Sequence, residues 1–207
     1  MTLALNLHLV HPKGAPQAVF SEDGRYRYQL TRCPKPRLPM LAVVGLSPST
    51  AGAYRNDSTV RNLLGLVEAS GHGGFTLVNL YAGIDADLKG IAAMDDPVGA
   101  LNDAYLQRAA QEHDLIVLAW GDDADPVRAR TVAARLWRTV CRTGGQLAVW
   151  QWTAGGQPHH PLYVNHATPL QCLSGGAHAD FVDVDPRWPA LVASSAEPAY
   201  AAGGQHV

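Results

Sequence analysis

Polar side chains follow four apolar runs of this 207-residue chain, at residues 41–46, 75–80, 115–120 and 146–150. Ser47, Ser49 and Thr50 follow the first run, Asn79 and Tyr81 lie at the end of the second, Trp120 and Gly121 at the end of the third, and His159 and His160 beyond the fourth. If the runs are parallel strands, their carboxyl ends meet at one edge, where open α/β sheets bind ligands. The sequence therefore predicts a functional site at that edge.

The pair His159-His160 is the strongest candidate for an acid, a base or an electrophile, because histidine titrates near neutral pH. Pro158 and Pro161 bracket the pair and restrict its backbone, and rigid support suits a catalytic group. Adjacent histidines also occur in ordinary surface loops, so that alternative stays open.

The segment 56–61, Asn-Asp-Ser-Thr-Val-Arg, precedes a helical pattern. Its hydroxyls and the helix N-terminus could hold a phosphate, with Arg61 adding positive charge and Asn56 and Asp57 nearby. The alternative is a plain helix cap, for which Ser58 and Thr59 are the candidates.

Several kinds of chemistry are disfavoured by the motifs. The run 47–50 has no Gly-x-Ser-x-Gly pattern, which argues against a Ser-His-Asp hydrolase. No phosphate-binding or dinucleotide-binding glycine loop is present. His159, His160, His166, Cys172 and His178 match no zinc spacing. We therefore expect neither a metal nor a cofactor.

The elements that must position these residues follow from hydrophobic spacing. Apolar residues at helical intervals predict helices over 60–69, about 100–112 and 126–143, and Asp23-Gly24 predicts the turn of a hairpin over 18–32. Strands that alternate with helices favour parallel pairing with helices on both faces. We expect a three-layer α/β/α fold with a central, mostly parallel four-stranded sheet, plus the N-terminal hairpin. One domain is expected over 1–190, with a flexible C-terminal tail over 191–207.

The bulk composition narrows the class of protein. A formal net charge of −2 excludes a global basic footprint for nucleic acid and leaves a local basic cleft open. Three widely spaced cysteines favour a reducing compartment. No stretch approaches the roughly 20 apolar residues of a membrane span, and the first residues lack the features of a signal peptide. We expect a cytoplasmic protein with no membrane contact, in an oligomeric state that the sequence leaves open.

Six segments occur in a fixed order along the chain. They are Leu-Ser-Pro-Ser-Thr-Ala (46–51), Asn-Asp-Ser-Thr-Val-Arg (56–61), Val-Asn-Leu-Tyr-Ala (78–82), Pro-Val-Gly-x-x-Asn-Asp (97–103), Ala-Trp-Gly (119–121) and Pro-His-His-Pro-Leu-Tyr (158–163). Together they resemble a bacterial and phage family known only as a domain of unknown function (family 1643), over roughly residues 25–173. That resemblance implies no activity.

The residues at the strand ends are also similar, more distantly, to the uracil-DNA glycosylase superfamily. There a first-strand Gly-x-x-Pro motif positions the attacking water, a second strand contributes Asn, a third ends in Gly, and a late His-Pro pair contacts the base. The matching positions here are 45–48, Asn79, Gly121 and 160–161. Ser47 stands where one branch of that superfamily carries Asn.

This second resemblance implies a uracil-DNA-glycosylase-like fold that hydrolyses a nucleobase–sugar bond of a nucleic acid or nucleotide. His160 would stabilise charge on the leaving base, and Ser47 or Asp57 would orient water. Asn79 would read the base, and Trp120 or Tyr81 would stack on it. The residues that would surround the substrate are Ser49, Thr50, Asn56, Arg61, Gly121 and His159. Two alternatives stay open: a non-catalytic nucleic-acid or nucleotide binder, and a small-molecule nucleoside hydrolase or transferase.

Overall fold

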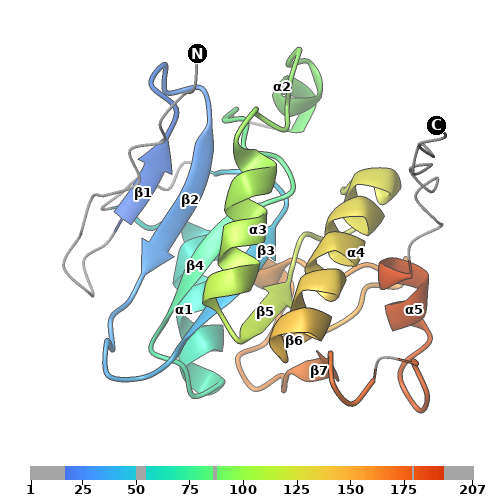
Figure 1. Ribbon diagram of the computed structural model, residues 1–207. Helices are drawn as coiled ribbons and strands as arrows, with labels where there is room; N and C mark the ends of the chain where they lie inside the picture. The colour runs from blue at the N-terminus through green and yellow to red at the C-terminus, as the bar shows by residue number, and fades with distance from the viewer. Residues whose placement is uncertain (1–16, 50–54, 86–87, 179, 194–207) are drawn as a thin grey trace, which may run out of the picture.

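A single sheet of seven strands, in the order β1-β2-β4-β3-β5-β6-β7, runs through the part of the chain that the computed structural model describes (Figure 1). The described residues are 17–49, 55–85, 88–178 and 180–193. The strands are β1 (Gln17–Phe20), β2 (Arg27–Arg32), β3 (Met40–Gly45), β4 (Gly74–Asn79), β5 (Leu115–Leu118), β6 (Gln146–Val149) and β7 (Gln171–Ser174).

The four strands expected from the apolar runs form the parallel middle of this sheet, β4-β3-β5-β6. The expectation of a four-stranded sheet is nevertheless wrong, because antiparallel strands extend it at both edges. β1 and β2 form the predicted hairpin, and β2 also pairs with β4, so the hairpin is part of the main sheet. β7 pairs with β6 and was not predicted, since only Leu173 among its four residues is fully buried.

Helices cover both faces of the sheet, as the alternation of strands and helices predicts. They are α1 (Ser58–Ala69), α2 (Leu88–Ala92), α3 (Asn102–Glu112), α4 (Pro126–Thr143) and α5 (Arg187–Val192), with a 3₁₀ turn η1 (Pro161–Tyr163). α1 packs on one face, in a core with β3 and β4, and α3, α4 and α5 pack on the other. Figure 1 shows α3 and α4 side by side across that second face. β3 and β4 are buried on both sides, which explains their continuous apolar sequence.

The helix ends follow capping chemistry, with one difference from expectation. Asp57, rather than Ser58 or Thr59, caps α1, because its carboxylate Oδ1 accepts the Val60 N–H at 2.7 Å. α4 begins at Pro126 and ends at Thr143, and Gly144 at its C-cap adopts φ 78°, as the sequence predicts. The start of α1 is therefore fixed by a carboxylate that belongs to the loop after β3.

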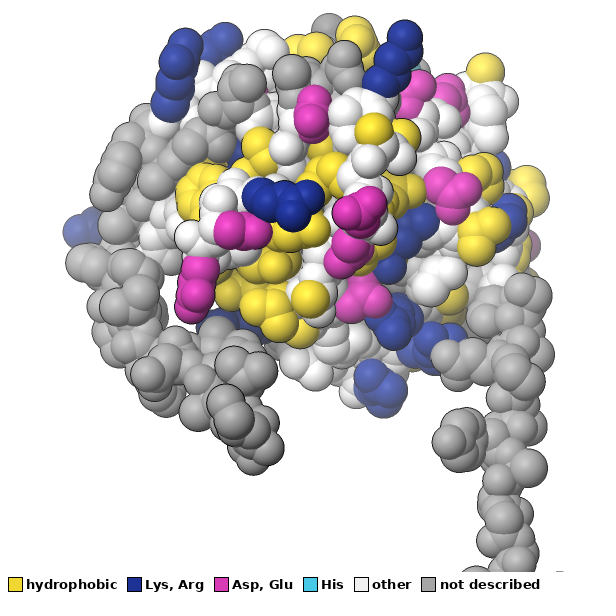
Figure 2. Space-filling model, turned by 90° about the horizontal axis from the view of Figure 1, so that it is seen from above, with side chains coloured by type: hydrophobic (Ala, Val, Ile, Leu, Met, Phe, Trp, Pro, Cys, Tyr) yellow, Lys and Arg dark blue, Asp and Glu magenta, His cyan; other side chains and the backbone are white. Residues whose placement is uncertain are grey.

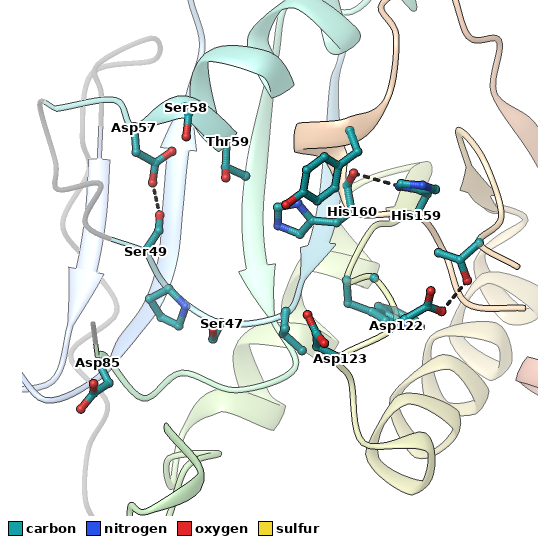
Figure 3. Close-up of a pocket in the computed structure, with 16 residues that line it drawn as sticks. Ser47, Ser49, Asp57, Ser58, Thr59, Asp85, Asp122, Asp123, His159 and His160 are labelled. Atoms are coloured by element: carbon teal, nitrogen blue, oxygen red, sulfur yellow. Dashed lines mark hydrogen bonds between the residues drawn. The ribbon is translucent and has the colours of Figure 1, made fainter. Parts of the chain in front are cut away.

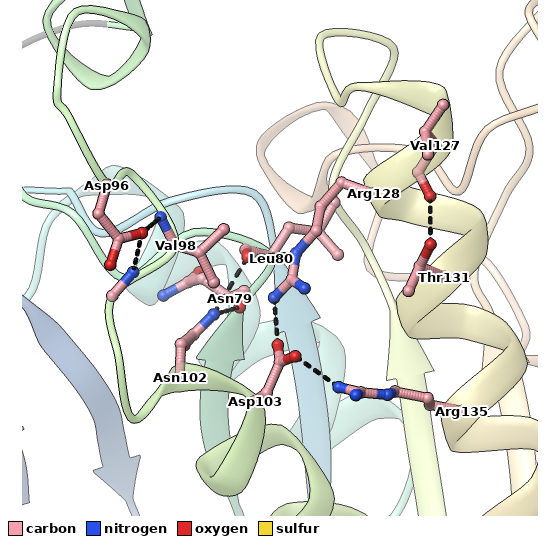
Figure 4. Close-up of polar contacts among 11 residues, drawn as sticks. Asn79, Leu80, Asp96, Val98, Asn102, Asp103, Val127, Arg128, Thr131 and Arg135 are labelled. Carbon is pink, nitrogen blue, oxygen red and sulfur yellow. Dashed lines mark hydrogen bonds and ion pairs between the residues drawn. The ribbon is translucent and has the colours of Figure 1, made fainter.

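The carboxyl end of β4 is held by a buried amide and an arginine (Figure 4). Asn102 Nδ2 donates to the carbonyls of Asn79 and Leu80, at 3.0 and 3.1 Å. Arg128 Nε also donates to the Leu80 carbonyl at 3.0 Å, and its guanidinium pairs with Asp103 at 2.6 Å. These bonds tie α3 and α4 to β4, and they fix the chain where it leaves the sheet.

The C-terminal part of the described chain is ordered further than expected. Trp188, Leu191 and Val192 of α5 are buried, and the Trp188 ring meets Trp152 edge-on at 4.9 Å between centroids. The expected tail therefore cannot begin at residue 191, and the remainder of that prediction, residues 194–207, lies outside the described residues. Of the helices that the structure describes, none combines the length and apolarity needed to cross a bilayer.

Candidate functional site

A cavity of about 570 Å³ opens at the carboxyl edge of the parallel strands (Figure 3). Its described lining residues come from the loop after β3, the first turn of α1, the loops after β4, β5 and β6, and η1. They are Leu46, Ser47, Pro48, Ser49, Asp57, Ser58, Thr59, Asp85, Trp120, Gly121, Asp122, Asp123, Thr153, His159, His160 and Tyr163. The cavity thus contains much of the predicted edge site.

Ser49 and Asp57 connect the loop after β3 to the start of α1. The Ser49 hydroxyl donates to Asp57 Oδ2, while Asp57 Oδ1 caps the helix. Ser47 lines the cavity on the same loop. Asp57 therefore has a structural bond on each oxygen and still faces the cavity (Figure 3). Thr50, the other predicted residue of this loop, lies outside the described residues.

His160 presents a neutral ring to the cavity. Its Nδ1 accepts the Leu162 N–H at 3.3 Å, which places the ring proton on Nε2. Burial, together with the neighbouring His159, lowers the pKa of His160 below its ordinary value, although the carboxylates of Asp123 and Asp57 oppose that shift. At neutral pH His160 is therefore an uncharged hydrogen-bond donor through Nε2–H.

His159 and Tyr163 stand beside His160. The His159 Nδ1 lies 3.3 Å from the His160 carbonyl oxygen (Figure 3). The backbone N–H of His159 donates to the Gln151 carbonyl at 2.8 Å. Tyr163 is 72% exposed, and its ring centroid lies 6.2 Å from that of His159 and 5.9 Å from that of His160. Tyr163 was not among the predicted site residues, because the 3₁₀ turn that brings it back to the cavity has no apolar periodicity.

Gly121 and Trp120 form the wall behind His160. Gly121 has φ +82°, and a β-carbon at this position would stand 3.2 Å from the His160 β-carbon. Its N–H donates to the Pro158 carbonyl at 2.8 Å, which joins the end of β5 to the histidine loop. Trp120 is 1% exposed and donates from Nε1 to Gln157 at 2.9 Å. Trp120 therefore contributes to the wall and has no open ring face for stacking.

The cavity is acidic. Asp57, Asp85, Asp122 and Asp123 are among the described lining residues, which include no Lys or Arg. Asp122 accepts the Thr153 hydroxyl at 2.5 Å, which fixes the two loops relative to each other. Four carboxylates in one hollow disfavour a phosphate and favour neutral or positively charged groups. Sequence reasoning missed this acidity because the residues come from three separate loops.

Four predicted residues lie outside the cavity lining. Asn56 accepts a hydrogen bond from Arg32 Nε at 2.7 Å, and its carbonyl accepts one from the Arg61 guanidinium at 2.8 Å. The side chains of Asn56 and Arg61 therefore stabilise the start of α1. Tyr81 packs against the core beside α3 and α4.

Asn79 is only 2% exposed and is not among the described lining residues. It is the register partner of Gly45 in the parallel pair β3–β4. A β-carbon on Gly45 would stand 2.7 Å from Asn79 Oδ1, so this side chain fills the space that the glycine leaves.

Within the described residues, no group of His, Cys, Asp and Glu side chains could hold a metal ion.

These features define an α/β protein with a mixed seven-stranded sheet and an acidic, histidine-bearing cavity at the carboxyl edge of its parallel strands. The chain belongs to the family described as a protein of unknown function (DUF1643), whose model matches residues 27–162. This span includes every described lining residue except Tyr163. No curated protein and no solved structure matches the chain.

Proposed function

We propose that this protein cleaves a nucleobase–sugar bond. The observation that carries the proposal is the presence of a neutral Nε2–H donor, His160, in one cavity with several carboxylates. When an N-glycosidic bond breaks, the base takes the bonding electron pair and the sugar develops positive charge. A fixed donor stabilises the first charge, and carboxylates stabilise the second.

The proposed roles follow from position in the cavity. His160 Nε2–H donates to the departing base as its negative charge develops. Asp57 or Asp123 accepts a proton from the attacking water, and the Ser47 hydroxyl helps to orient that water. The water oxygen bonds to the sugar carbon, the carbon–nitrogen bond breaks, and the base leaves with its electron pair. The products are the free base and a sugar that carries a new hydroxyl group.

The acidity of the cavity favours a substrate part that carries no phosphate. Carboxylates accept hydrogen bonds from sugar hydroxyls and repel phosphate groups. The exposed ring of Tyr163, beside both histidines, is better placed than Trp120 or Tyr81 to stack on a base. The more distant resemblance to the uracil-DNA glycosylase superfamily supports cleavage of the same bond.

The test is release of free base, measured by liquid chromatography, from nucleosides, nucleoside 5′-monophosphates and base-modified oligonucleotides. We expect release from at least one class, and a large loss in His160→Ala. His113→Ala is the matched control, because His113 binds the Ala109 carbonyl at the end of α3 and does not line the cavity. The proposal fails if no class releases base, or if His160→Ala cleaves as well as the control.

A second candidate is binding of a nucleic acid without cleavage, and the charge of α4 favours it. α4 carries five arginines and no acidic residue: Arg128, Arg130, Arg135, Arg138 and Arg142. Of these, Arg130, Arg135, Arg138 and Arg142 are exposed. The spacing of three and four residues places the last three on one side of the helix. On the face shown in Figure 2, Lys and Arg side chains are interspersed with Asp and Glu side chains.

A further inference from the structure

Asn62, in the second turn of α1, connects that helix to the histidine loop. Its Nδ2 donates to the Pro161 carbonyl at 2.6 Å and to the Val164 carbonyl at 3.2 Å. Its Oδ1 lies 2.7 Å from His166 Nε2. One side chain thus bonds to both ends of η1 and to the segment that follows it.

These partners fix the direction of the Asn62 amide. Carbonyl oxygens accept hydrogen bonds only, so the amide nitrogen must face Pro161 and Val164. The amide oxygen then faces His166, whose Nε2 must carry a proton and donate it. All three contacts are therefore satisfied in a single arrangement, and no flipped amide would satisfy them.

Gly65, one turn further along α1, makes room for the His166 ring. A β-carbon on Gly65 would stand 2.6 Å from His166 Nε2 and 2.7 Å from its Nδ1. Glycine in a helix interior is unfavourable because of its backbone freedom, so it needs a packing reason. The close packing of the His166 ring against Gly65 provides that reason.

The bridge joins two walls of the cavity. The N-cap and the first turn of α1 contribute Asp57 and Thr59 to the lining, and the histidine loop contributes His160 immediately before Pro161. We propose that Asn62 and His166 are positioning residues, which hold the His160 ring at a fixed distance and direction from the Asp57 wall. This inference rests on the proposed function, because it assigns a geometric task to the same cavity. Displacement of a catalytic group by about 1 Å can lower a rate by about 100-fold.

Asn102 is a matched control for Asn62. Its Nδ2 also donates to two backbone carbonyls, those of Asn79 and Leu80, but it lies on α3 and does not line the cavity. Replacing either residue by Asp puts a carboxylate against two carbonyl oxygens. Both Asn62→Asp and Asn102→Asp should therefore lower the melting temperature, whereas only the former should displace His160.

The experiment compares Asn62→Ala, Asn62→Asp and Asn102→Asp by base-release kinetics and by NMR titration of the His160 ring. We expect the Asn62 variants to lose roughly 10- to 100-fold in kcat with a smaller change in KM. A loosened loop also exposes His160 to water, so its pKa should rise toward 6.5. Asn102→Asp should leave both readouts unchanged.

Two milder variants keep the test decisive if an Asn62 variant does not fold. His166→Ala removes the donor to Asn62, whereas His166→Gln retains an N–H group that can reach Oδ1. We expect His166→Ala to shift the His160 titration and His166→Gln to restore it. The inference is overturned if folded Asn62 or His166 variants show an unshifted His160 titration. Because the titration needs no substrate, this failure is distinct from failure of base release.

Discussion

The β-carbon of His160 lies against Gly121, at the point where β5 leaves the sheet. A side chain at Gly121 would approach it to 3.2 Å, and the φ of +82° at this glycine is rarely adopted by other residues. Gly121 also donates its N–H to Pro158, two residues before His160. The end of the third parallel strand therefore sets the position of the histidine loop.

Gly121→Ala should weaken both the fold and the site. We expect a loss of roughly 1–2 kcal/mol from the positive φ, and a further loss of His160 function because the new methyl group presses on the His160 β-carbon and shifts the side chain that it carries. Gly144→Ala is the matched control, since Gly144 has φ +78° with nothing within 4 Å of its β-carbon position. Urea unfolding and base release measure the two effects. Equal loss of activity in both variants would contradict the direct contact.

The pH dependence should report the state of His160. Its lowered pKa, caused first by burial and then by His159, keeps the ring neutral through the physiological range. Activity should therefore fall as the pH drops through the folded-state pKa of His160, which lies below 6.5, and a pH–rate profile measures this fall. The same depressed pKa makes stability decrease as the pH falls below 6.5, because the unfolded chain binds the proton more readily.

Asp123→Asn should move the fall of activity at low pH to a still lower pH. The Asp123 carboxylate opposes the effect of burial on His160, so its removal lowers the pKa of His160 further. Asp122→Asn is the control, because Asp122 lines the same cavity but is not among the charges that shift His160. NMR titration of the imidazole protons measures both variants. An equal shift of the His160 pKa in Asp123→Asn and Asp122→Asn would show that the overall acidity of the cavity, rather than Asp123, sets this pKa.

Asp57 should have separable roles in stability and in charge. Asp57→Ala removes the cap of α1 and should cost about 1 kcal/mol in the free energy of unfolding. Asp57→Asn keeps a capping oxygen, so it should cost less while lowering the pKa of His160. Urea unfolding and the His160 titration distinguish these effects. Equal destabilisation by both variants would contradict a simple capping role.

The arginines of α4 should decide whether a nucleic acid binds. If they contact phosphates, replacing Arg135, Arg138 and Arg142 by Gln should lower the slope of log affinity against log salt by about 2 to 3. Fluorescence anisotropy with a labelled oligonucleotide measures the slope. A triple variant of Arg25, Lys35 and Lys89 removes the same charge elsewhere and should leave the slope unchanged. An equal effect of the two would exclude a docking surface on α4.

The main strands and helices could be predicted from local patterns. The runs that form β3, β4, β5 and β6 are continuous and apolar because most of their residues are buried. The residue types alone therefore indicate that these segments are buried. β7 escaped prediction because its residues are mostly exposed or half-buried, and its identity as a strand comes from pairing with β6.

The candidate site could be predicted only in outline. Strand ends indicated the edge where Ser47, Asp57 and His160 meet. Asn79 ends the same kind of strand, yet its side chain is buried in the space left by the missing side chain of Gly45. Whether a polar residue faces a cavity depends on its partner across the sheet, which sequence spacing does not specify.

The sequence by itself determined the layered α/β architecture and the edge that holds the histidine pair, because burial and turn chemistry act over a few residues. The tertiary structure alone decided the acidity of the cavity and the proton position on His160. It also decided the bridge from Asn62 to His166. These features depend on groups distant in the chain that meet within a few ångströms, where electrostatic and hydrogen-bonding energies are set by distance and not by sequence order.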